Sequence, residues 1–372
     1  MRFPTFEMER MQSAWEHRVR YDLSESGVEP LTLAEASARL RQLQPWLEDV
    51  KLGYADGRGR EATRAGVARI HPGATAENVL ITAGTSEANF LALTTLVERG
   101  DDVVIVMPNY MQVHGLARGL GANVHEVWLH EDAGWRLDLD RLRSAMTPKT
   151  KLVCICTPNN PTGQILSAAD LDAVAETART SGAWVLSDEV YRGAELDGVE
   201  SPSLWGRYEK AIVTGGLSKA YGLPGLRIGW IVAPPERIDA AWAQKDYTTI
   251  AVASISEVLA EAALARRDEL LQRTRTIICE RWPVLEAWAT AHGRKLHWTA
   301  PRAGAICFFG YSYEVDPGPF VDALIRERST MIVPGSHFLA DRHLRIGFGG
   351  PVALLRAGLA EIDAALAAFG RG

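Results

Sequence analysis

The chain is poor in cysteine, with four in 372 residues, and its nine histidines are scattered. No group of Cys and His shows the spacing of metal ligands, so the sequence gives no reason to expect a metal site. Cys154 and Cys156 alternate within the apolar run LVCICT, which would place both on one face of a buried strand. Because buried cysteine behaves as a small hydrophobic residue, both are expected in the core.

An excess of positive charge is absent as well. The formal net charge is −6, whereas proteins that bind nucleic acid or anionic membranes concentrate Lys and Arg. Neither kind of partner is therefore expected. The N-terminal segment MRFPTFEMERMQSAWEHRVRY is charged and has no apolar core, so it predicts neither a secretion signal nor a membrane anchor. The expected location is cytoplasmic.

What the chain does have is a regular alternation of strand and helix patterns. Its 372 residues, 47% of them hydrophobic, can bury a large core and predict two domains. Alternation from Val79 to Trp230 predicts an α/β fold, a mostly parallel sheet with helices on both faces. Within this pattern, strands are predicted at Val79–Thr82 and Asp102–Met107 and a helix from Glu87 to Glu98. Helices are also predicted over 5–20, where the helix is amphipathic, and over 33–43. A helical region over 255–291 and a mixed pattern after it predict a smaller α+β domain. We expect an N-terminal segment (1–35) packed at the active-site mouth, a large domain (36–254) and a small domain (255–372).

The stretch TGGLSKAYGLPGLRIGW, from Thr214 to Trp230, carries a single lysine, Lys219, among mainly Gly, Leu, Ala and Tyr residues. Such surroundings disfavour the ammonium form, and a neutral amine can form a Schiff base with an aldehyde. Arg227 follows between glycines, where a guanidinium can hold a phosphate by a two-pronged contact. A lysine for an aldehyde and an arginine for a phosphate suggest pyridoxal phosphate. The plainer alternative is a solvated surface lysine.

Four further motifs have both a structural and a functional interpretation. A glycine turn over 84–86 opens a helix, where free N–H groups suit a phosphate or where Thr and Ser serve only as caps. The run TPNNPTG, over 157–163, forms a rigid turn. Asp188 ends a strand at the sheet edge where ligands bind in α/β folds. Arg345 is a lone charge in an apolar run and needs an anion, which a buried salt bridge would also supply.

Together with Tyr54, Tyr110 and Tyr191, these motifs stand in the order typical of the fold-type I pyridoxal-phosphate aminotransferases of classes I and II, which the chain resembles over nearly its whole length. The resemblance implies that Lys219 carries pyridoxal 5'-phosphate as a Schiff base. It also implies that Asp188 keeps the pyridine nitrogen protonated and that Tyr191 completes the catalytic set.

The resemblance assigns the cofactor to these residues: Tyr54, Gly84, Thr85, Ser86, Tyr110, Asn160, Asp188, Tyr191, Ser218, Lys219 and Arg227. Tyr110 matches an aromatic residue that stacks on the cofactor ring, although an ordinary packed tyrosine is the alternative. Gly216 departs from the family, since many members carry a hydroxyl residue there. Phosphate binding is therefore expected to rest on Thr85, Ser86, Ser218 and Arg227.

For the substrate, the resemblance implies that Arg345 and Asn160 hold the α-carboxylate side of an amino acid. In the family the N-terminal segment lines the active-site mouth, which brings in Glu25, Ser26 and Gly27, although SESG also fits a polar surface loop. A carboxylate at that position favours a cationic, arginine-like side chain over a dicarboxylic one. If Glu25 only caps a turn, a neutral amino acid is equally compatible.

The implied function is transfer of an amino group between an L-amino acid and a 2-oxo acid. The run LSKAYGLPGLRIGWIVAPPE and the RIGFGG ending are similar to capreomycidine synthase-like members, which leaves a cyclase or lyase acting on a hydroxylated arginine derivative as an alternative. Tyr191 and the ordinary NNPTG run favour amino transfer. A non-catalytic ligand sensor is a third class, but such proteins usually carry a DNA-binding extension, and none is expected here. Tyr54 matches a residue that serves the neighbouring subunit, which implies a homodimer with shared active sites.

Overall fold

The computed structural model describes residues 2–40, 47 and 49–369. Its central feature is a seven-stranded sheet of order β2-β8-β7-β6-β5-β3-β4. The strands are β2 (Val79–Thr82), β3 (Asp102–Met107), β4 (Asn123–Trp128), β5 (Thr150–Cys156), β6 (Trp184–Asp188), β7 (Ala211–Gly216) and β8 (Gly229–Val232). Five neighbouring strands, from β7 to β4, are parallel, and β8 runs antiparallel to both of its neighbours. The predicted α/β fold with a mostly parallel sheet is confirmed.

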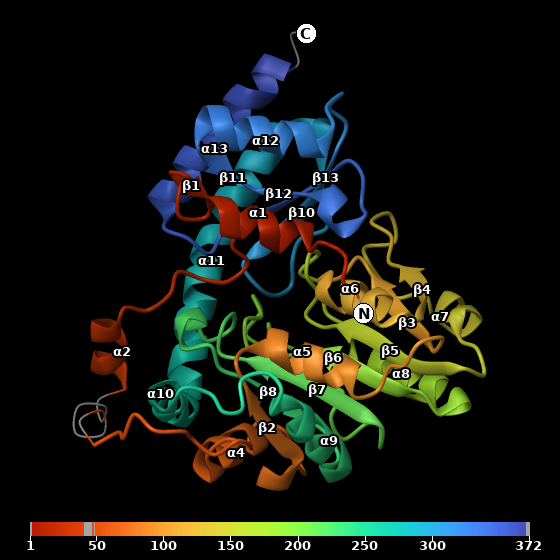
Figure 1. Ribbon diagram of the computed structural model, residues 1–372. Helices are drawn as coiled ribbons and strands as arrows, with labels where there is room; N and C mark the ends of the chain where they lie inside the picture. Colours follow the sequence, from red (N-terminus) through yellow and green to blue (C-terminus); the bar gives the residue numbers. More distant parts are fainter. Residues whose placement is uncertain (1, 41–46, 48, 370–372) are drawn as a thin grey trace.

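Helices cover both faces of this sheet because its strands are apolar on both sides. Val103 and Ile105 of β3 pack with one core cluster, and Val104 and Val106 pack with another. The helices of this part are α4 (Glu61–Ala68), α5 (Thr85–Thr94), α6 (Gln112–Leu120), α7 (Leu139–Ala145), α8 (Ala168–Ser181) and α9 (Pro235–Lys245). Figure 1 shows these helices around the sheet in the lower half of the molecule.

A second, smaller unit follows (Figure 1, top). Its four-stranded antiparallel sheet has the order β12-β13-β10-β9. Helix α10 (Ser254–Ala265) still packs on α4 in the lower part of the molecule, and α11 (Arg267–Ala291) follows it. The elements of the smaller unit after α11 are β9 (Leu296–His297), β10 (Ile306–Tyr311), α12 (Pro317–Arg328), β11 (Thr330–Met331), β12 (Val333–Pro334), β13 (His343–Gly347) and α13 (Val352–Phe369). Helix α11 runs from the large sheet up into this unit. The sequence predicts a mostly parallel α/β part followed by a smaller α+β part, and the two sheets follow this order. The domain boundaries remain predictions.

The N-terminal segment contacts both parts of the molecule, since Phe6 packs on Tyr110 beside the large sheet and Tyr21 pairs with a strand of the smaller unit. It contains α1 (Glu7–Trp15), β1 (Tyr21–Asp22) and α2 (Leu33–Arg39). Strand β1 pairs with β11 in parallel, with Tyr21 opposite Thr330. Helix α1 therefore lies against the lower side of the smaller unit, facing the sheet below (Figure 1).

Several predicted bounds need correction. The helix expected from Glu87 to Glu98 begins at Thr85 and ends at Thr94, because Gly84, with φ 84°, already turns the chain into the helix. The helix expected over 5–20 ends at Trp15. The helix expected over 33–43 is described only to Arg39, and its last part lies outside the described residues. In the described part of the chain, no helix is long and apolar enough to cross a membrane.

Candidate active site

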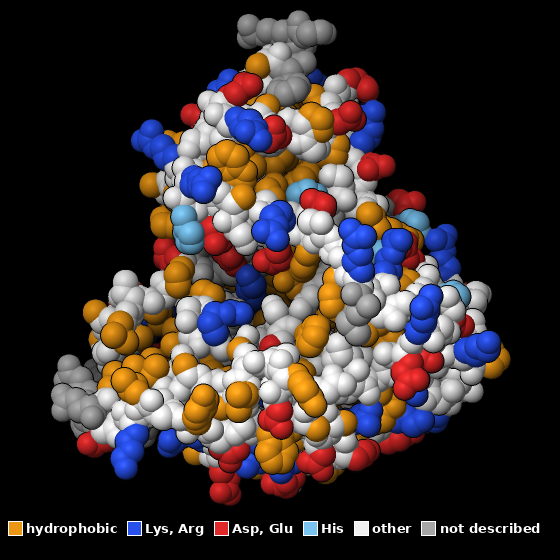
Figure 2. All heavy atoms as spheres, viewed as in Figure 1, with side chains coloured by type: hydrophobic (Ala, Val, Ile, Leu, Met, Phe, Trp, Pro, Cys, Tyr) orange, Lys and Arg blue, Asp and Glu red, His pale blue; other side chains and the backbone are white. Residues whose placement is uncertain are grey.

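A cavity of about 280 Å³ lies between the carboxyl ends of the large sheet, α1 and the smaller unit. Figure 2 shows the hollow between the upper and lower parts of the molecule, with charged side chains around it. Most residues singled out from the sequence line it: Glu25, Ser26, Thr85, Ser86, Tyr110, Asn160, Asp188, Tyr191, Ser218, Lys219, Arg227 and Arg345. Residues as far apart in the sequence as Glu25 and Arg345 are thus brought together. We call the part formed by the sheet the cofactor end, and the part formed by α1 and residues 24–26 the mouth.

Lys219 follows β7 and its ammonium lies 2.5 Å from the carboxylate of Glu25. Gly27 is close by, since a Cβ there would lie 3.4 Å from Lys219 Cδ and 3.2 Å from Glu25 Oε1. Burial lowers the pKa of Lys219, but the Glu25 carboxylate and Tyr191 together outweigh burial and raise it. Burial likewise raises the pKa of Glu25, but Lys219 brings it down to about 2. The sequence predicts that Lys219 is easily neutralised. The ion pair with Glu25 corrects this prediction for the cofactor-free protein, because it favours the charged ammonium.

The turn before α5 forms a cradle for an anion. Gly84 has a positive φ, and a Cβ at this position would lie 2.4 Å from Nη2 of Arg227. The hydroxyl of Thr85, at the first turn of α5, is buried and has no hydrogen-bond partner among the described residues. A Cβ at Gly216 would lie 2.6 Å from that hydroxyl, so the cradle leaves no room for a side chain at this position. Helix N–H groups, a free hydroxyl and a guanidinium suit a phosphate.

Asp188 ends β6 at the floor of the cavity and is buried. Its Oδ2 accepts a hydrogen bond from Nδ2 of Asn89 (2.9 Å), whose Oδ1 in turn accepts from the Thr214 hydroxyl (2.8 Å). Burial raises the pKa of Asp188, and the bond from Asn89 opposes this. Sequence reasoning missed Asn89, although a lone amide in the apolar helix SEANFLAL is a usable signal. These two hydrogen bonds fix the Asp188 carboxylate in one orientation.

Arg345 of β13 is only 1% exposed. Its Nη1 donates to Oδ1 of Asn160 (2.8 Å) and its Nη2 donates to the carbonyl of Ser24 (2.6 Å). Its Nε is buried without a partner, and no carboxylate among the described residues lies within ion-pair distance of the guanidinium. The structural alternative for Arg345, a buried salt bridge, therefore does not account for it.

Tyr191 connects the cofactor end to the mouth. Its hydroxyl donates to the Ser26 hydroxyl at 2.8 Å, and burial raises the pKa of the phenol to about 12. Ser26 was chosen from the sequence only because of its position in the N-terminal segment. The contact places both residues at one point of the cavity wall.

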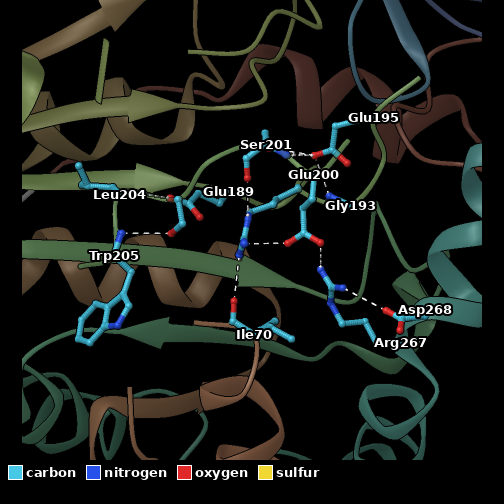
Figure 3. Close-up of polar contacts among 12 residues, drawn as sticks. Ile70, Glu189, Gly193, Glu195, Glu200, Ser201, Leu204, Trp205, Arg267 and Asp268 are labelled. Carbon is cyan, nitrogen blue, oxygen red and sulfur yellow. Dashed lines mark hydrogen bonds and ion pairs between the residues drawn. The ribbon is translucent and has the colours of Figure 1, made fainter. Parts of the chain in front are cut away.

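The chain just after Tyr191 is held by buried ion pairs and hydrogen bonds (Figure 3). The carboxylate of Glu195 accepts bonds from the backbone of Gly193 and from both Ser201 donors. The carboxylate of Glu200 lies between Arg192 and Arg267, the first residue of α11. These contacts tie the loop behind the cofactor end to the helix that links the two units.

Helix α1 forms the wall of the mouth, which the sequence did not indicate. Met8, Glu9, Gln12, Ser13 and Glu16 line the cavity on one helical face. The helix is fastened there because the Tyr110 hydroxyl donates to Oε1 of Glu9 (2.8 Å) and Nε2 of Gln12 donates to the Ser24 hydroxyl (3.0 Å). Burial and the Glu9 carboxylate raise the pKa of Tyr110. The mouth therefore presents three carboxylates, those of Glu9, Glu16 and Glu25.

Tyr54 does not line this cavity and is 90% exposed. Leu52 and Tyr247, which are 87% and 91% exposed, lie in the same two loops as Tyr54 and Ile250. Their two loops are joined because buried Lys245 donates to the carbonyls of Gly57 (2.8 Å) and Ile250 (2.9 Å). The hydroxyls of Thr248 and Thr249 bond to Glu87 in the first turn of α5, so this surface adjoins the anion cradle.

The chain was compared with known families and structures. The family model of aminotransferase class I and II matches residues 48–362. Capreomycidine synthase of Streptomyces vinaceus is 33% identical over 95% of this chain and 92% of its own. Arginine–pyruvate transaminase of Pseudomonas aeruginosa is 32% identical over 49% of this chain and 48% of its own. The structure of a PLP-dependent aminotransferase from Streptococcus suis superimposes with a TM-score of 0.93 and 32% identity, covering 99% of each chain.

Proposed function

Since the chain belongs to the aminotransferase class I and II family, we propose that it moves an amino group between an L-amino acid and a 2-oxo acid. The observation that carries this proposal is the guanidinium of Arg345, buried in the cavity wall without a carboxylate partner. A buried charge needs a counter-ion, and a planar guanidinium binds a carboxylate through two parallel hydrogen bonds. The α-carboxylate of an amino acid and that of a 2-oxo acid both meet this need.

The cofactor of this family is pyridoxal phosphate, and the residues present fit it. The cradle of Gly84, Thr85 and Arg227 suits the phosphate, and the buried carboxylate of Asp188 suits a protonated ring nitrogen. When bound, the cofactor supplies an aldehyde for amines and a ring that takes up the electron pair released from the substrate Cα. Asn160 and Tyr191 line the same cavity, where they could donate hydrogen bonds to the phenolic oxygen carried by the cofactor ring.

In this proposal Lys219 acts twice. Its Nζ would hold the cofactor and, when free, would take a proton from the substrate Cα. Lys219 lines the same cavity as Asp188 and Arg345, so the residues that would hold the cofactor ring and the substrate carboxylate are gathered around one space. Orientation of this kind replaces a chance encounter with an effectively unimolecular step.

The mouth supports a substrate with a cationic, arginine-like side chain. Glu9, Glu16 and Glu25 line the same cavity as Arg345, which would hold the α-carboxylate. Three carboxylates in one wall disfavour a dicarboxylic substrate and suit a guanidinium. A transaminase of arginine and pyruvate among the relatives is in keeping with this choice.

A second candidate is a pyridoxal-phosphate cyclase or lyase acting on a hydroxylated arginine derivative. It is favoured by the similarity to capreomycidine synthase over nearly the whole chain. Both candidates require Lys219, Asp188 and Arg345. They differ in the fate of the nitrogen, which leaves the donor in transamination and stays with the product in cyclisation.

We also propose that two copies pair through the surface of Leu52, Tyr54 and Tyr247. Side chains of this size are seldom left together and exposed on a monomer. Because the surface adjoins the cradle, Tyr54 of one copy would reach the phosphate of the other. Light scattering should give a dimer for the wild type and a shift to monomer for Tyr247→Asp. A functional wild-type monomer would contradict shared sites.

Absorption spectroscopy of the cofactor-loaded protein tests the proposed activity. Adding a competent amino acid alone should abolish the visible band of the cofactor, and a 2-oxo acid added afterwards should restore it. Arginine, phenylalanine and aspartate added separately would rank the donors. If every donor leaves the band unchanged, or if no 2-oxo acid restores it, the protein does not perform transamination with these compounds.

A further inference from the structure

A second cavity, of about 240 Å³, lies beside the active site and shares the wall formed by Cys156. We call it the Trp135 cavity. Its lining includes the apolar side chains of Val106, Ile155 and Leu166 and the side chains of Trp135, Arg136 and Arg302. The volume lies below the range of about 300–1,000 Å³ that is usual for drug-sized ligands, so it suits a smaller molecule.

Trp135 is the most unusual residue of this cavity. Its side chain is 5% exposed, yet its indole N–H has no hydrogen-bond partner among the described residues. Its backbone has φ 57°, the left-handed region that bulky side chains rarely adopt. Buried donors are normally satisfied, and strained backbone tends to persist where function requires it. The residue is held in place by packing on Phe308 and His343 of the smaller unit.

The charges of the cavity favour an anion. Arg136 and Arg302 both line it and are exposed at its edge. Within the described part of the chain, neither guanidinium has a carboxylate partner, and Arg136 donates only to the carbonyl of Ala133. Asp170 lines the cavity too, but its carboxylate already accepts two bonds from Ser167 as the cap of α8. Two unpaired cations and one engaged carboxylate leave a positive edge.

The remaining polar side chains are also committed to partners inside the protein. Oδ1 of Asn159 accepts two bonds from Thr162, and Nδ2 of Asn159 donates to the carbonyl of Pro108. Gln164 donates to the carbonyl of Ala300. The guanidiniums of Arg136 and Arg302 are therefore the charged donors that line the cavity without a carboxylate partner among the described residues.

We propose that the Trp135 cavity is a second binding site, for a small organic anion with an apolar body. The negative group would bind Arg136 and Arg302, and the apolar part would lie on Val106 and Ile155 beside the indole. The loop of Arg302 comes from the smaller unit, and the N–H groups of Arg302 and Ala303 donate to the carbonyl of Gly163. A ligand here would thus bridge the two units at the turn that carries Asn160, the partner of Arg345.

The test uses 4-bromobenzoate on the cofactor-loaded protein. In crystals soaked with it, the anomalous signal of bromine should place one molecule in the Trp135 cavity. In calorimetric titrations, Arg302→Glu should weaken this binding about tenfold or more, because it removes a charged hydrogen-bond donor and reverses its sign. Arg294→Glu changes the charge equally at an exposed position away from the cavity and should leave the affinity within about twofold.

Two further variants separate this site from the substrate site. Arg345→Lys should leave the affinity for 4-bromobenzoate in the Trp135 cavity unchanged, and Trp135→Leu should weaken it by removing the flat apolar surface beside which the ligand would lie. Bromine found only near Arg345, or an affinity that Arg302→Glu does not alter, would overturn the proposal. Neither result would bear on the proposed amino transfer.

Discussion

The cofactor end and the mouth of the active site are built in different ways. At the cofactor end, side chains follow strands of one sheet and are fixed by neighbours in that sheet and in the helix on it, as Asp188 is by Asn89 of α5, which in turn accepts a bond from Thr214 of β7. The mouth is assembled by an N-terminal segment that reaches this part through side-chain contacts, such as those of Glu9 with Tyr110 and of Glu25 with Lys219. The residues of the proposed chemistry are thus held mainly by the sheet and its helices, and the residues of the proposed substrate choice are held by the N-terminal segment.

Substitution of Lys219 should produce the largest effect. Lys219→Ala removes both the group that holds the cofactor and the proposed proton carrier, so turnover should fall by more than about a thousandfold. Borohydride treatment of the loaded wild type should attach the cofactor to Lys219, as peptide mass spectrometry would reveal. Lys149→Ala, at an exposed position, is the control and should retain activity. Attachment to a different lysine would place the chemistry elsewhere.

Asp188→Asn should have the next largest effect. The asparagine side chain has the same shape as that of Asp188 and can keep the bond to Asn89, but it lacks the negative charge that would stabilise a protonated ring nitrogen. Turnover should therefore fall by about a hundredfold to ten-thousandfold. Cofactor content measured by absorbance should stay near that of the wild type. Near-normal turnover would mean that the cofactor end does not depend on this carboxylate.

Changes at the mouth should alter selectivity and spare the chemistry. Glu25→Gln should lower kcat/KM for arginine about tenfold, because one charged contact is lost, and should leave the value for phenylalanine nearly unchanged. Glu9→Gln should act in the same direction, and exposed Glu98→Gln serves as control. Equal losses for both donors would show that the mouth takes part in the chemistry, and no change in their ratio would remove the acidic-pocket explanation.

The smallest effect concerns the pair of Lys219 and Glu25 in the cofactor-free protein. The pKa of Glu25 is lowered to about 2, so its contribution to stability is present above its usual value of about 4.3 and is lost as the pH falls towards 2. The pKa of Lys219 is raised, so its contribution is lost at high pH, above about 10.4. Because Glu25 is half-exposed, Glu25→Gln should lower the melting temperature at pH 7 by at most about 3 °C. The difference should shrink steadily below pH 4; a constant difference would contradict the ion pair.

The sequence was informative where local pattern and spacing determine structure. Strands such as Val79–Thr82 and Asp102–Met107 were predicted to the residue, because uninterrupted apolar runs between turns leave few alternatives. Lys219, Asp188 and Arg345 were identified through their motifs, and the structure brings them into one cavity.

What the sequence could not give depends on tertiary contacts. An amphipathic N-terminal helix was expected, but nothing in its pattern indicated that Glu9 and Glu16 would face a cavity rather than water. The ion pair that raises the pKa of Lys219 joins residues 194 positions apart, and no local rule predicts it. The strained Trp135 lies in a polar turn, where a single aromatic residue carries no signal of its own.

The fate of the donor nitrogen tests the central claim most directly. The cofactor-loaded enzyme would be incubated with arginine labelled with ¹⁵N at the α-amino group and with pyruvate, and the products analysed by mass spectrometry. Transamination predicts labelled alanine and an unlabelled 2-oxo acid derived from arginine, both lost in Lys219→Ala. Substrate consumption with the label retained in a cyclised or eliminated product, and no labelled alanine, would contradict amino transfer and favour the cyclase or lyase.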